Sequence, residues 1–251
     1  MQKLSVIIIT HNEEENILRC LASVKDLADE IVIVDSFSTD RTTEICRSSG
    51  CKVVTHAFEG YGQQKQFAVE QTGNNWILSL DADEEVTEEL KQEIKTLLNQ
   101  ASVSCSGYRI PFALFYMGRI LRHSGTGNEF HLRLFDRTKG RFTVVKVHEG
   151  IEVSGSIGEL NGRIMHYSYR DLSHHLQKIN TYTTQAAEEY IHRGRSFSKV
   201  WVVFKFPVTF FVFYVIRLGI LDGYPGFLWS FFAAFYGSLK VAKTIEMQKK
   251  K

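Results

Sequence analysis

The chain has 251 residues, enough for one α/β domain and an additional segment. Its 30 Lys and Arg residues nearly balance its 28 Asp and Glu residues, and no basic stripe is interleaved with aromatic side chains, so the composition argues against a nucleic-acid-binding protein. The four cysteines form no CxxC pair and no metal-binding spacing with histidine, which is typical of a reducing compartment. The N-terminal apolar run is too short for a signal peptide, which favours a cytoplasmic location.

Apolar β-branched runs alternate with helical patterns along the N-terminal part of the chain. The run after Leu4 reads as a buried strand, and the spacing that follows predicts a helix with Asn12 as its cap. Thr87 is predicted to cap a later helix. Such alternation predicts an α/β fold with a mostly parallel sheet flanked by helices. The predicted strands cover residues 4–9, 31–34, 52–58 and 75–80.

Polar residues follow three of these strands where each strand ends. Thr10 and Asn12 follow the first strand, and Asp35 follows the second. Asp81 and Asp83 follow the fourth strand. Because the carboxyl ends of parallel strands meet at one edge of a sheet, these side chains should line one ligand-binding crevice. The sequence contains neither GxGxxG nor GxxxxGK[ST], so we expect neither a dinucleotide site nor a Walker-type phosphate site.

The segment "ILSLDADEEV" joins a buried strand to a cluster of carboxylates. Two aspartates separated by one small residue, Asp81 and Asp83, can hold a divalent cation against a phosphate. The simpler alternative is an acidic cap on the helix that follows, since carboxylates favour the positive end of the helix dipole. We assign this simpler role to the neighbouring carboxylates Glu84, Glu85, Glu88 and Glu89.

Three segments resemble the signature segments of family 2 glycosyltransferases, which have the GT-A fold. They read "SVIIITHNEEENILRCLASV", "IVIVDSFSTDRT" and "WILSLDADEEV". The later segments "HLRLFDRTKGRF", "KVHEG" and "GILDGYPGFLWSFFAAFYGSLK" resemble the branch that includes the lipopolysaccharide core β-1,4-glucosyltransferases. This resemblance implies an inverting transferase that moves a hexose, glucose in the first instance, from a UDP-sugar to a lipid-linked glycan. It also implies Mg²⁺ or Mn²⁺ as cofactor.

The resemblance implies roles for individual residues. Asp83 would bind the metal, and Asp81 would contact the ribose or the water shell of the cation. Asp35 would accept a hydrogen bond from a uracil-like base, and its simpler alternative is a residue in a turn. Nucleotide contacts are also expected from Thr10, Asn12, Glu13 and Lys65, and a contact with donor phosphate or acceptor is expected from Arg133. For the lysine and the arginine, the simpler alternative is a solvated surface charge.

The acceptor hydroxyl must lose a proton, which requires a base within hydrogen-bonding reach. In "VVKVHEGIEV" the resemblance implies Glu149 as this base and His148 as a contact to metal or phosphate, or as an orienting group. The alternative is a His-Glu pair that only forms ion pairs with Arg133 or Arg163.

Three later histidines receive different interpretations. His166, in "IMHYSY", is a further candidate metal ligand. A lone histidine is more often a satisfied core residue, so that alternative stays open. His174 and His175 lie beside a helical pattern, and we expect both on the surface.

The C-terminal part of the chain is rich in aromatic residues, and we predict one domain over residues 1–195 and a helical segment over 196–251. Its uncharged runs fall short of the ~20 residues that a spanning helix prefers, and Pro225-Gly226 would form the turn between them. We therefore expect two interfacial helices. The aromatic residues expected at the level of the lipid headgroups are Trp201, Tyr224, Trp229 and Tyr236.

Lysines near the C-terminus, from Lys240 onward, would then meet anionic lipid. The alternative is that these helices pack on the domain or on a second copy of the chain in a homo-oligomer. The large aromatic side chains exceed what a small helical pair can bury in water. This favours peripheral or monotopic attachment at the cytoplasmic face of a bacterial inner membrane.

Three other functions compete with this interpretation. A polyprenyl-phosphate glycosyltransferase would use the same site with a phosphate as the acceptor. A sugar nucleotidyltransferase would need a glycine-rich triphosphate loop after its first strand, where this chain has "THNEEE". A catalytically silent glycan- or lipid-binding protein is the third alternative, and the presence of Asp81, Asp83 and Glu149 argues against it.

Overall fold

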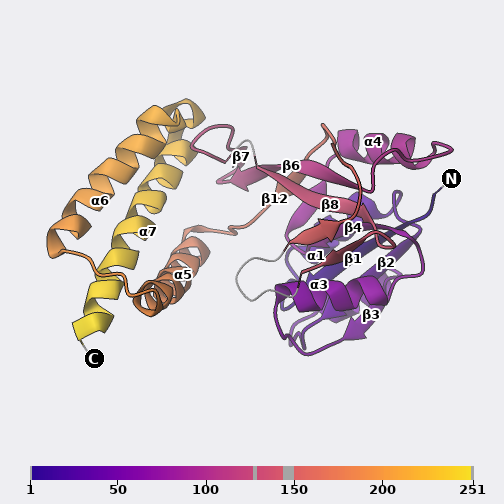
Figure 1. The fold of residues 1–251 in the computed structure, drawn as a ribbon, viewed down its shortest axis with the longest axis horizontal. Coiled ribbons are helices and arrows are strands. Elements are labelled where there is room, and N and C mark those ends of the chain that lie inside the picture. Colours follow the sequence, from indigo (N-terminus) through magenta and orange to yellow (C-terminus); the bar gives the residue numbers. More distant parts are fainter. Residues whose placement is uncertain (1, 127–128, 144–149, 250–251) are drawn as a thin grey trace. The chain divides into compact units, whose positions relative to one another are not determined.

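The computed structural model describes residues 2–126, 129–143 and 150–249. The chain forms two compact units (Figure 1). We call them the sheet unit, which comprises Met1–Phe112 and Glu129–His166, and the helical unit, which comprises Ala113–Asn128 and Tyr167–Lys251.

The predicted domain boundary at residue 195 falls inside the helical unit. Helices on both sides of that residue pack together, and the Lys243 ammonium donates over 2.7 Å to the carbonyl of Asn180 and to the hydroxyl of Thr184. The helix that precedes residue 195 therefore belongs structurally with the aromatic tail.

The main sheet has the strand order β3-β2-β1-β4-β8-β6-β12-β5, with β7 and β11 paired to β6. Strands β1, β2, β3 and β4 pair in parallel, so their carboxyl ends share one edge. Strand β8 pairs antiparallel with both β4 and β6. The predicted α/β class is confirmed, with the parallel half at the N-terminal end of the chain. The parallel strands are β1 (Leu4–Thr10), β2 (Glu30–Asp35), β3 (Lys52–Thr55) and β4 (Trp76–Asp81).

The remaining strands are short, apart from β6 and β8. Strand β5 begins three residues after β4 ends and pairs antiparallel with β12, which places His166 opposite Glu84. Strands β9 and β10 form a separate antiparallel pair. Their bounds are β5 (Glu84–Val86), β6 (Gly107–Tyr116), β7 (Arg119–Ile120), β8 (Phe130–Asp136), β9 (Gly140–Phe142), β10 (Ile151–Val153), β11 (Ile157–Glu159) and β12 (Ile164–His166).

Apolar side chains project from both faces of the parallel strands. For this reason helices cover both faces of the sheet. On β1, Val6 and Ile8 join one core cluster with α1 and α4, whereas Ile7 joins a second cluster with α3. This alternation is what a strand requires when it is buried on both sides. The helices of the sheet unit are α1 (Ile17–Val24), α2 (Thr42–Ser48), α3 (Tyr61–Glu70) and α4 (Glu88–Leu98).

The helix caps differ in part from the prediction. Thr87 caps α4, where its hydroxyl accepts from Leu90 N, and Glu88 and Glu89 lie in the first turn as expected. Asn12 does not cap α1, because that helix begins only after Asn16. Asn12 has a φ of 56°, and its side-chain carbonyl accepts from Thr39 N over 2.8 Å. A contact with a distant loop therefore replaces the local capping role.

The helical unit contains α5 (Leu172–His192), α6 (Lys199–Phe211) and α7 (Gly223–Lys249). A π-helical turn over Val212–Ile216 continues α6, and a short 3-10 turn over Gly219–Asp222 leads into α7. The prediction of a turn at Pro225-Gly226 was wrong, since both residues lie in the first turn of α7. Proline is tolerated there because that turn leaves its backbone N–H groups unpaired in any case.

One stretch of the described residues, Lys199–Ile216, is long and apolar enough to cross a membrane, with a mean hydropathy of 1.7 over 18 residues. The helix is longer than the uncharged run in the sequence because Lys205 lies within it.

His175 is buried, contrary to the prediction that it lies on the surface. Its Nδ1 lies 2.9 Å from the hydroxyl of Tyr116, and its ring packs near Tyr169 and Trp229. Trp229 therefore packs inside the helical unit, whereas Trp201 and Tyr224 are exposed. The sequence pattern could not reveal this cluster because its rings come from β6, the segment before α5, α5 itself and α7.

Candidate functional site

The carboxyl ends of β1 and β2 bring two predicted residues together. Thr10 and Asp35 are direct neighbours in the parallel register, and the Thr10 hydroxyl donates to Asp35 Oδ1 over 3.1 Å. Both are buried, and Asp35 Oδ2 also accepts from Ser38 N over 2.9 Å. The Asp35 carboxylate is therefore held in one orientation at the strand end.

The loop after β1 is tied to the loop after β2. Asn12 N donates to the Ser38 hydroxyl over 2.9 Å, and Glu13 N donates to the Thr42 hydroxyl over 2.8 Å. The Glu13 carboxylate accepts from Asn16 Nδ2 over 2.8 Å. These contacts shape the two loops that the sequence assigned to the nucleotide.

Asp81 ends β4 between two basic side chains. Lys65 Nζ lies 2.9 Å from Asp81 Oδ1, and an Arg133 guanidinium nitrogen lies 3.3 Å from Oδ2. Lys65 is buried and the side chain of Arg133 is only 13% exposed, so neither is a solvated surface charge. Burial by itself raises the pKa of Asp81, but the charges of Lys65 and Arg133 outweigh it and hold that pKa below its usual range.

Glu84 belongs to the same site, which the sequence analysis missed. Its side chain is fully buried, accepts from Asp81 N over 2.8 Å and pairs with Arg133 at 2.8 Å. Burial raises the pKa of Glu84 to about 7, against the lowering effect of Arg133. The predicted helix-cap role was wrong for Glu84 and for Glu85, because both lie in β5, which pairs with β12. The only sequence signal is the position of Glu84 directly after "DAD".

Asp83 and His166 form the second half of the site. Pairing of β5 with β12 brings the two together, and His166 Nε2 lies 3.3 Å from Asp83 Oδ2. Burial by itself lowers the pKa of His166, but the hydrogen bond and charge of Asp83 raise it above its usual value. Asp81, Asp83 and Glu84 thus lie among three basic groups, which are Lys65, Arg133 and His166.

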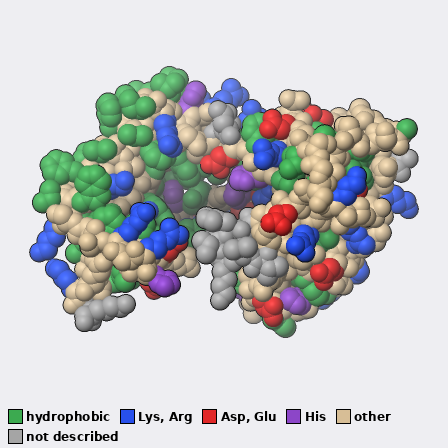
Figure 2. Space-filling view, in the orientation of Figure 1, with side chains coloured by type: hydrophobic (Ala, Val, Ile, Leu, Met, Phe, Trp, Pro, Cys, Tyr) green, Lys and Arg blue, Asp and Glu red, His purple; other side chains and the backbone are tan. Residues whose placement is uncertain are grey.

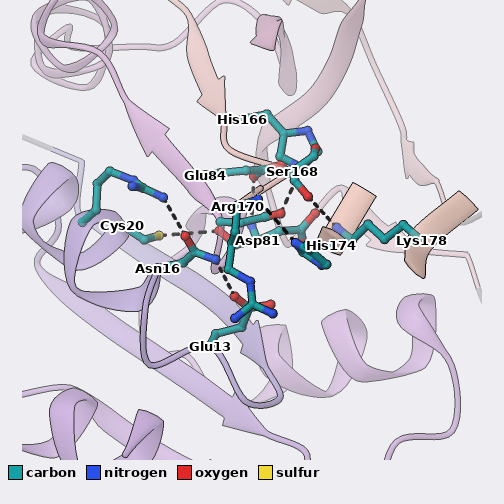
Figure 3. A network of polar contacts seen from close by, with 12 residues as sticks. Glu13, Asn16, Cys20, Asp81, Glu84, His166, Ser168, Arg170, His174 and Lys178 are labelled. Carbon is teal, nitrogen blue, oxygen red and sulfur yellow. Dashed lines mark hydrogen bonds and ion pairs between the residues drawn. The ribbon is translucent and has the colours of Figure 1, made fainter. Parts of the chain in front are cut away.

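Helix α1 packs beside the end of β4. In Figure 3, Asn16 and Cys20 lie beside Asp81, and the Cys20 thiol donates to the carbonyl of Asp81 over 3.6 Å. Asn16 also accepts from Arg19 over 2.7 Å while donating to Glu13. The first loop and the end of β4 are therefore linked through one helix.

Few protein side chains at this site could bind a metal ion. Within the described ranges, no group of three or more His, Cys, Asp or Glu side chains is arranged to hold a metal ion. Asp83 offers a hard carboxylate oxygen of the kind that Mg²⁺ and Mn²⁺ prefer, and His166 offers an imidazole nitrogen. Asp81 faces Lys65 and Arg133 instead. Two protein ligands fit a metal that binds together with the oxygens of a diphosphate.

His148 and Glu149 lie outside the described residues. The residues that flank them are tied together, since Thr143 N donates to the carbonyl of Gly150 over 2.8 Å. This contact continues the pairing of β9 with β10.

The sequence analysis also missed a polar group beside the loops that follow β1 and β2. Gln64 is buried, and its amide donates to the Ser36 hydroxyl over 2.9 Å. Its carbonyl lies 2.9 Å from Nδ1 of His56, whose ring stacks on Phe67 at 3.9 Å. In the sequence, a glutamine in "GYGQQKQFA" carries no signal of burial.

Carboxylates, a lysine and an arginine thus gather at the carboxyl edge of a parallel sheet, where sheets of this class bind their ligands. The model of glycosyl transferase family 2 matches residues 5–153, and the chain belongs to this family. The predicted resemblance is thereby confirmed, and the protein is a glycosyltransferase.

Two curated relatives extend over nearly the whole chain. An uncharacterized glycosyltransferase of Rickettsia typhi is 31% identical and covers 100% of this chain and 89% of its own length. The lipopolysaccharide core biosynthesis glycosyltransferase LpsC of Rhizobium meliloti is 33% identical and covers 96% of this chain and 91% of its own length.

A solved structure, that of S. aureus TarS residues 1–349, is 25% identical and covers 47% of this chain and 37% of that chain. Its TM-score is 0.39, so the family assignment rests on the sequence comparisons.

Proposed function

We propose that the chain is an inverting, metal-dependent hexosyltransferase that moves a hexose, in the first instance glucose, from a UDP-sugar to a lipid-linked glycan such as the lipopolysaccharide core or another cell-envelope polysaccharide. The observation that carries the proposal is the cluster at the carboxyl end of β4, in which Asp81 and Asp83 lie within 3.3 Å of basic side chains. The acceptor class is supported by the LpsC relative, whose name assigns it to lipopolysaccharide core biosynthesis.

The donor nucleotide would lie across the ends of β1, β2 and β4. Asp35, oriented by Thr10 and Ser38, would accept a hydrogen bond from the base. Asn12 and Glu13 would contact the nucleotide from the loop after β1. Asp81 would contact the ribose.

Positive charge for the diphosphate comes from both sides of Asp81. Lys65 pairs with Asp81 and Arg133 pairs with the buried Glu84, so their charges are already oriented before the donor binds. Asp83 and His166 would hold Mg²⁺ or Mn²⁺, which stabilises the negative charge on the leaving nucleotide.

The acceptor side of the reaction needs a base. Glu149 would take the proton of the acceptor hydroxyl, and His148 would orient the reacting groups. The acceptor oxygen then bonds to the anomeric carbon while the bond from that carbon to the UDP oxygen breaks. Attack on the face opposite UDP inverts the anomeric configuration. A lipid-linked acceptor and a nucleotide sugar meet at the cytoplasmic face of the bacterial inner membrane, where we place the reaction.

The test measures donor hydrolysis with UDP-, GDP- and CMP-sugars, in Mn²⁺ and in EDTA. We expect metal-dependent turnover of one UDP-sugar, lost in Asp83→Ala and retained in Glu88→Ala, which removes an exposed carboxylate from the first turn of α4. Absence of both turnover and metal-dependent UDP binding would leave a silent binding protein as the better interpretation.

The variant Glu149→Gln distinguishes the proposed function from that of a polyprenyl-phosphate glycosyltransferase. An ionised phosphate acceptor needs no base, so that variant would keep transfer to polyprenyl phosphate. Transfer to a sugar hydroxyl should instead fall by roughly a hundredfold or more, while UDP binding stays intact.

A further inference from the structure

Helix α6 has its apolar face turned outward. Apart from Lys199 at its first position, the side chains exposed on this helix are uncharged, and Figure 2 shows hydrophobic side chains gathered over it. Six apolar side chains along this face are each between 43% and 70% exposed. They are Val200, Val203, Phe204, Val208 and Phe211 of α6 and Val215 of the π-helical turn, which together we call the α6 stripe.

The opposite face of α6 packs on α7 and carries the polar groups. A side-chain carbon of Lys205 lies 3.4 Å, and the hydroxyl of Thr209 3.8 Å, from the position that a Cβ on Gly237 would take. Aromatic pairs complete this interface, with Phe206 against Phe231 and Phe210 against Phe227. A water-exposed helix normally shows the reverse arrangement, with its polar residues outward.

Cations flank the α6 stripe at both ends. Lys199 begins the helix and Arg217 follows the π-helical turn, and both side chains are exposed. Residues 196–251 contain eight Lys and Arg residues but only two acidic residues, Asp222 and Glu246. Asp222 is buried, where its carboxylate accepts from the backbone N–H groups of Arg122 and His123.

Two further arginines lie beside the 3-10 turn Gly219–Asp222, which we call the α6–α7 turn, because both contact Asp222. Arg122 N donates to Asp222 Oδ1 over 3.2 Å, and Arg119 Nη1 lies 3.4 Å from the carbonyl of Asp222. Both arginines are exposed, and so are Ile220 and Leu221 in the turn itself. The turn therefore joins apolar side chains to several guanidinium groups.

We propose that the α6 stripe and the α6–α7 turn dock the chain on an anionic lipid bilayer, with α6 lying in the plane of the interface. An apolar helix face needs an apolar partner, and the cations beside it match the phosphates of anionic headgroups. One face of α6 packs along α7 and carries Lys205 and Thr209, so only the opposite face is free to meet lipid, which favours a helix that lies in the interface.

A second copy of the chain fits this face less well. Antiparallel pairing of two α6 stripes would place Lys199 of one copy near Arg217 of the other, and parallel pairing would place like cations together. Both arrangements bring positive charges close across an apolar contact, which costs free energy.

The test measures flotation of the full chain with phosphatidylethanolamine–phosphatidylglycerol vesicles and with phosphatidylcholine vesicles. Val203→Ser/Phe204→Ser/Val208→Ser should lower partitioning into the anionic vesicles by about a hundredfold, because three apolar contacts with the bilayer are lost. The matched control is Leu18→Ser/Phe58→Ser/Leu176→Ser, which changes apolar side chains that are similarly exposed but lie outside the stripe. The control should bind as the wild type does.

Charge is tested separately with Lys199→Glu, which should weaken binding to anionic vesicles by roughly tenfold and leave binding to neutral vesicles unchanged. Circular dichroism of each variant checks that the helices remain folded. The proposal is overturned if the wild type binds neither vesicle, or if the stripe variant binds as tightly as the control. It is also overturned if the stripe variant binds vesicles as the wild type does and differs only in sedimenting as a monomer where the wild type sediments as a dimer.

The docking surface would bring the proposed transferase to the membrane that holds its lipid-linked acceptor, and only this biological role rests on the proposed function. Vesicle binding requires no donor, metal or acceptor. Retained vesicle binding with no sugar transfer would contradict the proposed function alone, and transfer to a soluble acceptor without vesicle binding would contradict the docking surface alone.

Discussion

Lys65 and Asp81 form an ion pair with Nζ 2.9 Å from Oδ1, in which the lysine is buried and the aspartate is partly exposed. One residue lies in α3 and the other at the end of β4, so the pair joins a helix to the strand that carries the candidate site. Lys65 is 2% exposed, and loss of its charge would leave the Asp81 carboxylate with only Arg133 as a cationic partner among the ion pairs described here.

Lys65→Met should therefore destabilise the fold. The loss leaves the partly exposed Asp81 carboxylate without its nearest cation, so the cost should lie between the ~1 kcal/mol of an exposed pair and the ~3–5 kcal/mol of a fully buried one. Urea unfolding followed by circular dichroism measures this change. The matched control is Lys91→Met, which removes a pair with the exposed Glu88 and should cost about 1 kcal/mol or less. Equal losses in the two variants would contradict the importance of the Lys65–Asp81 pair.

His166→Gln should weaken the response to metal. If His166 binds the cation beside Asp83, its loss should raise the Mn²⁺ concentration for half-maximal donor hydrolysis by about tenfold or more. Isothermal titration of Mn²⁺ in the presence of UDP gives a second readout. His131→Gln serves as the control, because its ring packs on Phe112 and its nearest carboxylate is Glu129. Identical Mn²⁺ curves for both variants would remove His166 from the metal site.

His175 should make the helical unit sensitive to acid. Burial, with smaller contributions from Lys178 and His174, lowers the pKa of His175 to about 4. The unfolded chain binds a proton near pH 6.5, whereas the folded chain does not until about pH 4, so stability falls as pH decreases through this window. The loss should reach on the order of 3 kcal/mol.

Thermal unfolding at pH values across this window measures the effect in wild type and in His175→Gln. The variant keeps a polar side chain without the titration, so its stability should depend less on pH between about 6.5 and 4. His192→Gln is the control, since His192 is exposed at the far end of the same helix. An unchanged pH dependence in His175→Gln would show that another group titrates.

Two glycines of α7 should respond in opposite ways to alanine. A Cβ on Gly226 would lie 2.0 Å from the carbonyl oxygen of Gly219, which is backbone and cannot move aside cheaply. Gly226→Ala should therefore destabilise the α6–α7 turn by about 1–3 kcal/mol. At Gly237 the nearest atom lies 3.4 Å away, so alanine should stabilise the helix by up to about 1 kcal/mol. Urea unfolding of both variants provides the test, and a stabilised Gly226→Ala would contradict the close approach.

Local sequence patterns were sufficient for the parallel half of the sheet. The runs that became β1, β2 and β4 are apolar on both faces, and such runs are stable only between two layers of helices. Polar residues directly after those runs must lie at the carboxyl edge, so Thr10 and Asp35 could be placed together from the sequence alone. The family resemblance and the candidate residues Asp81 and Asp83 follow from the same segments.

Tertiary structure decided which carboxylates and cations meet. Pairing of β5 with β12 joins residues about eighty positions apart, and it turned Glu84 from an expected helix cap into a buried partner of Arg133. The same pairing brought His166 to Asp83. Charge and periodicity in a sequence report local conformation, whereas burial of a charge depends on what the rest of the chain places against it. For that reason the buried state of Lys65 and His175, and the outward apolar face of α6, became visible only in the folded protein.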